Sequence, residues 1–231
     1  MTQPKAKENK EKRVSKTEPK LLIELDERQK QVVEAFYEHD FVIVEGKWGS
    51  GKTMASVATA IKSHRKREFN KMTVTRPFIP DKGLGALPGE IESKLTFEMQ
   101  PILDNYHECQ GKEQTDKMLK DGTIKLQYNG KVKGLTVKSS IFLCDETQDL
   151  TYTQFLELLT RLGKDSKMIC TISKEQIHSS IGKDSCYYKL RHLKDSGIVG
   201  WVELEANHRH SVINEIIDYI EQKEKEENNP K

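Results

Sequence analysis

The stretch FVIVEGKWGSGKT, residues 41–53, decides the fold. Its first four residues are β-branched or aromatic, which is typical of a short buried strand. The remainder fits the spacing G-x-x-x-x-G-K-[ST], in which Gly46 comes first and Gly51, Lys52 and Thr53 come last. A loop of this kind points successive backbone N–H groups at a phosphate chain and needs glycine where a Cβ would intrude. The stretch therefore predicts a strand, a phosphate-binding loop and a helix that begins near residue 52.

Several residues of this loop have a predictable chemical role. Lys52 is expected to reach the β- and γ-phosphates of a nucleotide, and the Thr53 hydroxyl is expected to bind Mg²⁺. Gly49 supplies a third position of unusual backbone conformation. Trp48 would either stack on a base or cover the phosphates. Upstream of the loop, the side-chain amide of Gln29 or of Gln31 could hydrogen-bond an adenine edge, unless both lie on a solvated helix face.

A second pattern, SIFLCDE at residues 140–146, is an apolar strand that ends in two carboxylates. Asp145 is placed to hold Mg²⁺, and Glu146 to polarise a water molecule for in-line attack on the γ-phosphate. A nucleotide-binding switch needs only the first of these carboxylates. The pair therefore favours ATP hydrolysis over nucleotide binding alone.

Three further polar residues lie at junctions where a site is expected. Gln176 follows a strand at residues 167–172, where its amide could sense the γ-phosphate. Arg209 precedes a late helix and is either an arginine finger or a surface residue. Arg76 ends a strand at residues 72–75, on the edge where ligands bind in parallel sheets.

The composition excludes several classes of protein. Of 231 residues, 32% are charged and 35% are hydrophobic, and nowhere do 18 apolar residues run together. The N-terminus has no apolar signal core, so a cytoplasmic protein without a membrane partner is expected. The four cysteines show no C-x-x-C spacing, which favours reduced structural thiols. Because the net charge is only +2, a nucleic-acid partner would need a local basic patch.

The chain divides into a core and two charged ends. Residues 1–20 are rich in Lys and Glu and are predicted to be disordered, as a solubilising tail or a basic arm. Residues 21–221 are predicted to form one domain, and 222–231 a charged tail. Within the domain, 78–134 resembles an insertion with helices and a hairpin at Asn129-Gly130. Its candidate nucleic-acid surface comprises Lys125, Tyr128, Lys131, Lys133 and Lys138.

Apolar spacing predicts three amphipathic helices with an inward face. The first opens at residues 25–29 and buries Val32, Val33 and Phe36. The second follows a capping-box pattern at 151–154 and ends at Gly163. Its predicted inward residues are Phe155, Leu158, Leu159 and Leu162. The third follows Arg209, and its predicted inward residues are Val212, Ile213, Ile216, Ile217 and Ile220.

Five motifs, taken in order, resemble those of the PhoH-like ATPases. They are GKWGSGKT, Arg76-Pro77, LGALPGE at 84–90, FLCDETQD at 142–149 and FLELLTRLG at 155–163. The core of that family is similar to the first RecA-like domain of superfamily 1 helicases. The resemblance covers residues 25–220 and implies an α/β fold, a parallel sheet sandwiched by helices.

The resemblance also sharpens the list of site residues. LDERQ at 25–29 is similar to the helicase Q motif, which favours Gln29 over Gln31 as the adenine contact. The predicted catalytic residues are Glu146, Lys52, Arg209 and Gln176, and the metal ligands are Thr53 and Asp145. The predicted nucleotide-binding residues are Gln29, Gly46, Lys47, Trp48, Gly49, Ser50, Gly51, Lys52, Thr53 and Met54.

Two segments depart from the family pattern. In the loop at 46–50, Lys47 and Trp48 stand where the family favours small residues. Where the family usually has T-G-D-x-x-Q, this chain has Ile172 and Ser173 in place of Gly and Asp, and keeps Gln176. The resemblance implies an ATPase that uses ATP and Mg²⁺ and acts with single-stranded RNA or DNA. Because a single core of this kind needs a neighbour to complete a translocating cleft, a homo-oligomer or a ring is also expected. One alternative is a regulatory or kinase-like phosphotransfer protein without a nucleic-acid partner. Another is a degenerate ATPase that no longer hydrolyses ATP because its third motif is altered.

Overall fold

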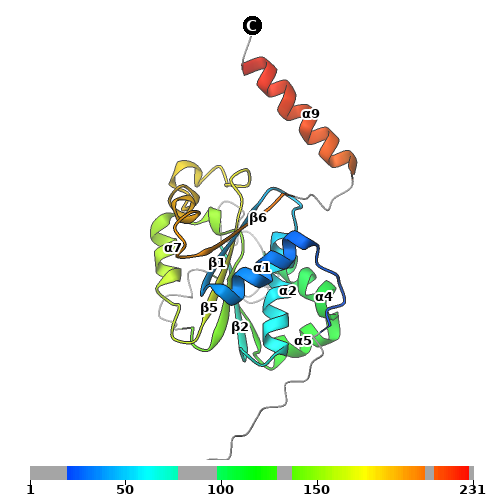
Figure 1. Cartoon of the computed structure of the whole chain (residues 1–231), viewed down its shortest axis with the longest axis vertical. Coiled ribbons are helices and arrows are strands. Elements are labelled where there is room, and N and C mark those ends of the chain that lie inside the picture. Colours follow the sequence, from blue (N-terminus) through cyan, green and yellow to red (C-terminus); the bar gives the residue numbers. More distant parts are fainter. Residues whose placement is uncertain (1–19, 78–97, 129–136, 206–210, 229–231) are drawn as a thin grey trace, which may run out of the picture.

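A six-stranded parallel sheet forms the centre of the protein, for which the computed structural model describes residues 20–77, 98–128, 137–205 and 211–228 (Figure 1). The strand order is β3-β2-β4-β5-β1-β6, and every neighbouring pair is parallel. β5 therefore lies between β1, which leads into the glycine-rich loop, and β4, which leads into the two carboxylates. The strands are β1 (Phe41–Gly46), β2 (Lys71–Arg76), β3 (Ile124–Tyr128), β4 (Ser140–Cys144), β5 (Lys167–Ile172) and β6 (Gly200–Leu204).

Helices cover both faces of the sheet, as the family resemblance implied (Figure 1). Successive residues of a strand point to opposite faces. Val42 and Val44 accordingly pack in one core cluster with α1, α2, α4 and α5, and Ile43 packs in the other with α7 and α8. The helices are α1 (Glu27–Glu38), α2 (Lys52–Arg65), α4 (Gln100–Gln110), α5 (Lys112–Lys120), α7 (Tyr152–Leu159), α8 (Tyr187–Leu190) and α9 (Ser211–Asn228).

Local sequence signals explain where two of these helices begin. Asp26 accepts a hydrogen bond from the Gln29 backbone N–H, and the Gln29 side chain accepts one from the Asp26 N–H. Thr151 and Gln154 form the same reciprocal pair at the start of α7, so the predicted capping box is confirmed. However, α7 ends at Leu159 with Thr160 as its cap, so Leu162 lies beyond the helix.

The described part of 78–134 differs from the expected insertion. β3 is an edge strand of the central sheet and pairs in parallel with β2. α4 and α5 form the connection between these two strands, because a parallel pair needs a crossover rather than a tight turn. Ile124 is buried in the same cluster as α2, so this segment completes the core. Residues 78–97 and the predicted hairpin turn at 129–130 lie outside the described residues.

The helix α9 does not bury the face that its spacing predicts. Val212, Ile216 and Ile220 are 45%, 53% and 52% exposed, and α9 projects away from the sheet (Figure 1). The prediction was wrong because periodicity identifies an apolar face but not what covers it. α9 also continues to Asn228, into the segment expected to be a charged tail. No helix in the described ranges combines the length and apolar character needed to cross a bilayer.

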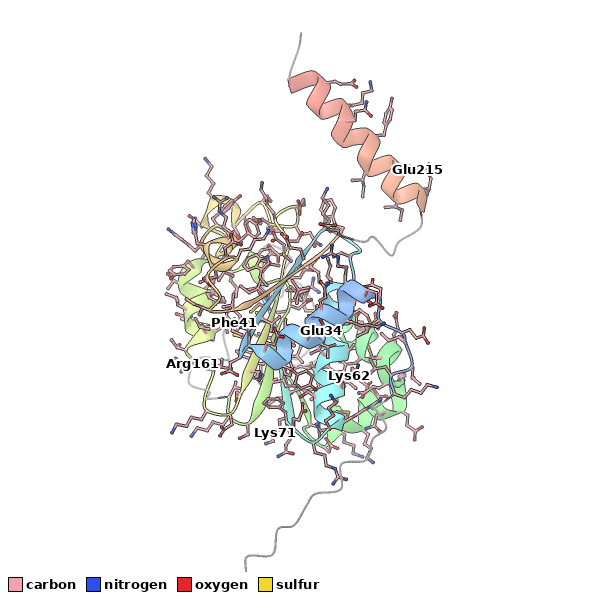
Figure 2. The ribbon with its side chains drawn as sticks, viewed as in Figure 1. Glu34, Phe41, Lys62, Lys71, Arg161 and Glu215 are labelled. Carbon is pink, nitrogen blue, oxygen red and sulfur yellow. The ribbon has the colours of Figure 1, made fainter. Side chains whose placement is uncertain are left out.

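The two ends of the parallel strands lie on opposite sides of the sheet, and Lys71 marks the side where the strands begin (Figure 2). Lys71 opens β2 at the edge where the strands begin, and Arg76 closes the same strand at the opposite edge. All the strands are parallel, so the residues that follow β1, β2, β4 and β5 share the edge of Arg76. Ligands of open α/β sheets bind at this carboxyl edge.

Candidate nucleotide-binding site

The glycine-rich loop joins β1 to α2 and has the backbone geometry that its sequence predicts. Gly49 and Gly51 have φ values of 73° and 79°, a region that other residues rarely adopt. Gly46 is needed for space, since a Cβ there would lie 2.4 Å from Ser50 Oγ and 2.6 Å from the Leu204 carbonyl oxygen. The loop therefore folds back on Gly46, which also lies against the end of β6.

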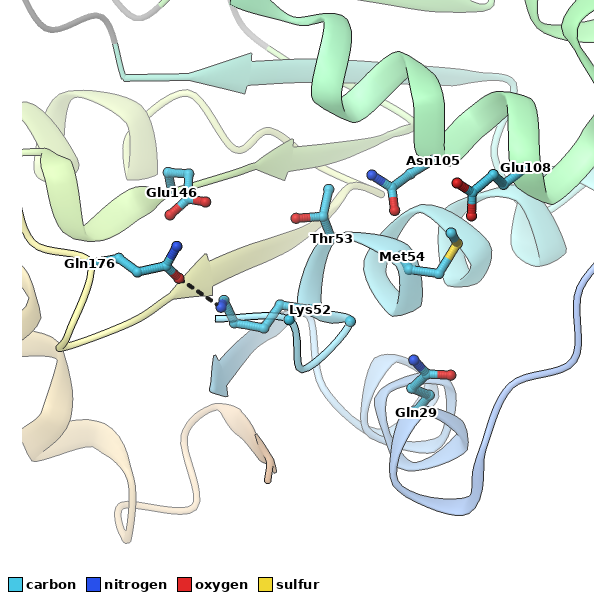
Figure 3. Close-up of a pocket in the computed structure, with 10 residues that line it drawn as sticks. Gln29, Lys52, Thr53, Met54, Asn105, Glu108, Glu146 and Gln176 are labelled. Atoms are coloured by element: carbon cyan, nitrogen blue, oxygen red, sulfur yellow. Dashed lines mark hydrogen bonds between the residues drawn. The ribbon is translucent and has the colours of Figure 1, made fainter. Parts of the chain in front are cut away.

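Lys52 connects this loop to a distant segment of the chain. Its Nζ donates to the carbonyl oxygens of Gly46 and Lys47 at 2.7 Å and 3.0 Å. It also donates to Gln176 Oε1 at 3.0 Å (Figure 3). These three acceptors hold the ammonium group at the base of the loop. The bond to Gln176 also places that residue beside the predicted phosphate position.

Thr53 and Asp145, the two predicted metal ligands, are directly hydrogen-bonded. Thr53 Oγ1 donates to Asp145 Oδ1 at 2.8 Å. Thr171 Oγ1 donates to the same carboxylate oxygen at 2.8 Å. Asp145 is only 2% exposed, so these hydroxyls compensate for the burial of its charge. The contact joins the end of β4 to the start of α2, across β5.

Glu146 has an unusual backbone conformation and a polar environment. Its φ of 52° is left-handed, an uncommon conformation that directs the side chain into the site. Gln148 Nε2 donates to Glu146 Oε2 at 2.5 Å, and an Arg76 guanidinium nitrogen lies 3.8 Å from Oε1. Burial and the neighbouring Asp145 charge raise the pKa of Glu146, whereas Gln148, Arg76 and Lys52 oppose that rise.

Thr171 and Gln148 stabilise the carboxylates beside the altered third motif. Thr171 Oγ1 accepts from the Glu146 backbone N–H at 2.9 Å in addition to its bond to Asp145. Gln148 Oε1 accepts from the Ser173 backbone N–H at 3.1 Å. Sequence reasoning assigned no role to Thr171. The available signal was a hydroxyl residue near the end of an apolar strand, at residues 167–172, which the structure places between β1 and β4.

A cavity of about 540 Å³ opens between the loop, α1 and α4 (Figure 3). Its lining contains eight predicted residues: Gln29, Gly49, Gly51, Lys52, Thr53, Met54, Glu146 and Gln176. The predicted residues Gly46, Lys47, Trp48, Ser50 and Asp145 lie outside the lining. Trp48 is 40% exposed, and Gln31 is exposed on α1. Asn105 and Glu108 of α4 also line the cavity, and sequence reasoning missed both. Arg209 lies outside the described residues.

This fold and cavity define a P-loop NTPase. A strand, glycine-rich loop and helix place Lys52 in the cavity, and Asp145 follows a strand that is separated from β1 by one other strand. The chain belongs to the PhoH family, because the family model described as "PhoH-like protein" matches residues 22–221. The predicted family and the predicted α/β fold are confirmed.

Individual relatives and solved structures are also similar to this chain. It is 30% identical over 194 residues to a PhoH-like protein of Bacillus subtilis, covering 82% of this chain and 61% of that protein. It is 31% identical over 145 residues to a PhoH-like protein of Synechocystis, covering 62% and 44%. The chain thus spans about half the length of these two relatives. The match to a large terminase from a thermophilic bacteriophage (TM-score 0.48, 12% identity) covers 78% of this chain and 45% of that one. The match to the Pif1 helicase of Candida albicans (TM-score 0.46, 13% identity) covers 85% and 43%.

Proposed function

We propose that this protein is a Mg²⁺-dependent ATPase. The observation that carries the proposal is the cavity in which Lys52 of the phosphate loop and Glu146 of the carboxylate strand both take part. Glu146 takes a proton from a water molecule as that water attacks the γ-phosphorus. The bond from the γ-phosphorus to the β–γ bridging oxygen breaks, and ADP and phosphate leave. Lys52 stabilises the negative charge on the transferred group.

The proposed metal site consists of Thr53 and Asp145. A hydroxyl and a carboxylate are hard oxygen ligands, and Mg²⁺ is commonly held by one or two protein groups together with phosphates and waters. Bound Mg²⁺ would neutralise charge on the β- and γ-phosphate oxygens. Asp145, fixed by Thr171, would position it.

Gln29 and Gln176 are proposed to bind the two ends of the nucleotide. Gln29 lies on the cavity wall, where its capping bond to the Asp26 N–H fixes the amide, and it is the proposed adenine contact. Gln176 is the proposed γ-phosphate sensor because its Oε1 accepts a hydrogen bond from Lys52 Nζ, the group that would bind the phosphate. Arg209 is proposed as an arginine finger that acts within one chain or across the interface of a homo-oligomer.

The role of Glu146 as the base is tested by removing the charge of Arg76 and measuring how hydrolysis depends on pH. A base must be deprotonated to accept a proton, so the rate falls as the pH drops through the pKa of Glu146. Arg76 is a cation that lowers this pKa. We therefore expect Arg76→Gln to move the acidic limb of the kcat profile to higher pH. Lys71→Gln, at the other end of β2, is the matched control and should leave the profile unchanged. An unshifted profile in Arg76→Gln would contradict the assignment of Glu146 as the base.

We also propose that hydrolysis is coupled to single-stranded RNA or DNA. Arg76 supports this, since it is a partly exposed cation at the carboxyl edge and is in contact with Glu146. It could therefore meet a phosphodiester and the catalytic carboxylate together. Two other candidate lysines are placed less favourably: Lys138 precedes β4 and Lys125 is the second residue of β3, both towards the opposite edge.

ATP turnover with and without oligonucleotide tests this coupling. We expect poly(U) or oligo(dT) to increase kcat, and the stimulation to weaken steeply with added KCl because phosphate contacts release counterions. Glu146→Gln measured in parallel reports any contaminating ATPase. If neither polymer changes kcat at low salt, the coupling is rejected and the regulatory or kinase-like alternative is favoured.

A further inference from the structure

The cavity has a nucleoside end whose acidic residue has no role in the hydrolytic scheme. Glu146 and Gln176 lie on one side of Lys52, and Gln29, Met54 and Glu108 lie on the other (Figure 3). Glu146 and Gln176 are assigned to the γ-phosphate, so a nucleotide bound to Lys52 must extend its nucleoside toward the second group. The unit that follows the α-phosphate is the ribose, so Met54 and Glu108 are the lining residues on its path toward Gln29.

The helix α4 forms one wall of this end. Asn105 and Glu108 are three residues apart and thus occupy one face of α4, directed toward Thr53 and Met54 (Figure 3). Cys109 Sγ lies 3.3 Å from Met54 Sδ, so α4 contacts α2 beside the loop. The Nδ2 of Asn105 donates to the Pro101 carbonyl oxygen at 2.6 Å, which fixes that amide. The position of Glu108 therefore follows from the packing of α4 on α2.

The chemistry of Glu108 restricts what it can recognise. An ionised carboxylate only accepts hydrogen bonds, and the phosphates of a nucleotide are anions that repel it. A carboxylate in a polyanion pocket is favourable where the ligand presents donors, and the ribose 2′- and 3′-hydroxyls are the donors next to the α-phosphate. Acidic residues that accept from a ribose hydroxyl occur in dinucleotide-binding folds by the same logic.

We propose that Glu108 binds the ribose hydroxyls of the nucleotide and makes this site selective for ribonucleotides over deoxyribonucleotides. The inference rests on the proposed ATP site and adds a specificity-determining residue to it. Met54 supplies the apolar surface beneath the sugar, and Gln29 contacts the base beyond it. Because Glu108 is exposed on a formed helix, its substitution leaves the fold unchanged.

Calorimetric binding of ATP, 2′-dATP and 3′-dATP in the presence of Mg²⁺ tests the proposal. The Glu146→Gln background is used to prevent turnover. We expect ATP to bind about 5- to 10-fold more tightly than at least one deoxynucleotide. This factor is the affinity expected from one hydrogen bond to a partly solvated charged group. Glu108→Ala should weaken ATP by that factor, leave that deoxynucleotide unchanged and so abolish the preference. Asp104→Ala, an exposed carboxylate on the same helix, should retain the preference.

Four outcomes overturn the proposal. Equal affinity for all three nucleotides in the Glu108-containing protein would show that the ribose hydroxyls are not recognised. Equal weakening of all three by Glu108→Ala would assign the effect to the base or to the packing of α4, and equal strengthening would assign it to lost charge repulsion with the phosphates. Failure of the protein to bind ATP would reject the ATP site itself together with this inference, whereas the first three outcomes leave the ATP site intact.

Discussion

Glu146→Gln is expected to abolish ATP turnover while ATP binding persists. General-base catalysis contributes at least about 100-fold to a rate, so kcat should fall by at least that factor. The substitution is nearly isosteric and retains groups that can hydrogen-bond Gln148, so ATP affinity should change by less than about threefold. Phosphate release measures the first quantity, and the ATP-induced rise in melting temperature measures the second.

The raised pKa of Glu146 is part of this expectation. Burial and the adjacent Asp145 make its carboxylate a stronger base than an exposed glutamate, and Gln148 and Arg76 hold it in place. Glu157→Gln on α7 is a suitable control, because it removes a carboxylate outside the cavity lining. Retention of more than about a tenth of wild-type turnover in Glu146→Gln would contradict the role of this residue as the base.

Lys52→Ala is expected to weaken ATP binding strongly. Lys52 is 6% exposed, and its ammonium group is held by three acceptors at the base of the loop. Loss of a buried, hydrogen-bonded charge that pairs with phosphate weakens binding by on the order of 100-fold. Calorimetry with MgATP measures the affinity, and the thermal shift produced by ATP should disappear.

Lys62→Ala provides the matched control for this loss. Lys62 lies in the last turn of the same helix, far from the loop, so its substitution should preserve the affinity for ATP. The unliganded melting temperature of Lys52→Ala is measured in parallel, so that any loss of stability from its three missing hydrogen bonds is separated from the loss of ATP binding. ATP affinity within about threefold of wild type in Lys52→Ala would show that the nucleotide does not bind at this loop.

The loop side of the cavity was predictable because its residues follow one another in the sequence. The loop between β1 and α2 contains its own strand, glycines, lysine and hydroxyl, so local spacing is sufficient to identify it. Asp145 and Gln176 were predictable for a different reason. Each follows an apolar strand, and parallel strands bring their carboxyl ends to one edge.

The wall of the cavity that α4 forms was not predictable, since it depends on how α4 packs on α2. Asn105 and Glu108 lie about fifty residues beyond the loop and belong to no recognised motif. They reach the cavity only because α4 lies against α2. The strand at Ile124–Tyr128 was predicted, but its place in the central sheet was not, because its pairing with β2 depends on the helical crossover rather than on local sequence.

The outer elements show the limit of periodicity. The spacing of α9 correctly predicts a helix with one apolar face, but Val212, Ile216 and Ile220 are exposed in the single chain. Burial depends on a packing partner as well as on the pattern, and no local signal in α9 identifies one. The ion pair between Arg76 and Glu146 likewise required the adjacency of β2 and β4, which strand prediction does not provide.

Phosphate release from ATP, measured with Mg²⁺ and with EDTA for the wild type beside Glu146→Gln, tests directly whether this site hydrolyses ATP. The proposed mechanism predicts release by the wild type with Mg²⁺, and only background release with EDTA or in the variant. Equal release by the two proteins would contradict it, as would no release by a wild type that binds ATP. In the latter case the site would bind nucleotide without hydrolysing it. The next variants to test would then be Ile172→Gly and Ser173→Asp, which return the third motif to the family pattern.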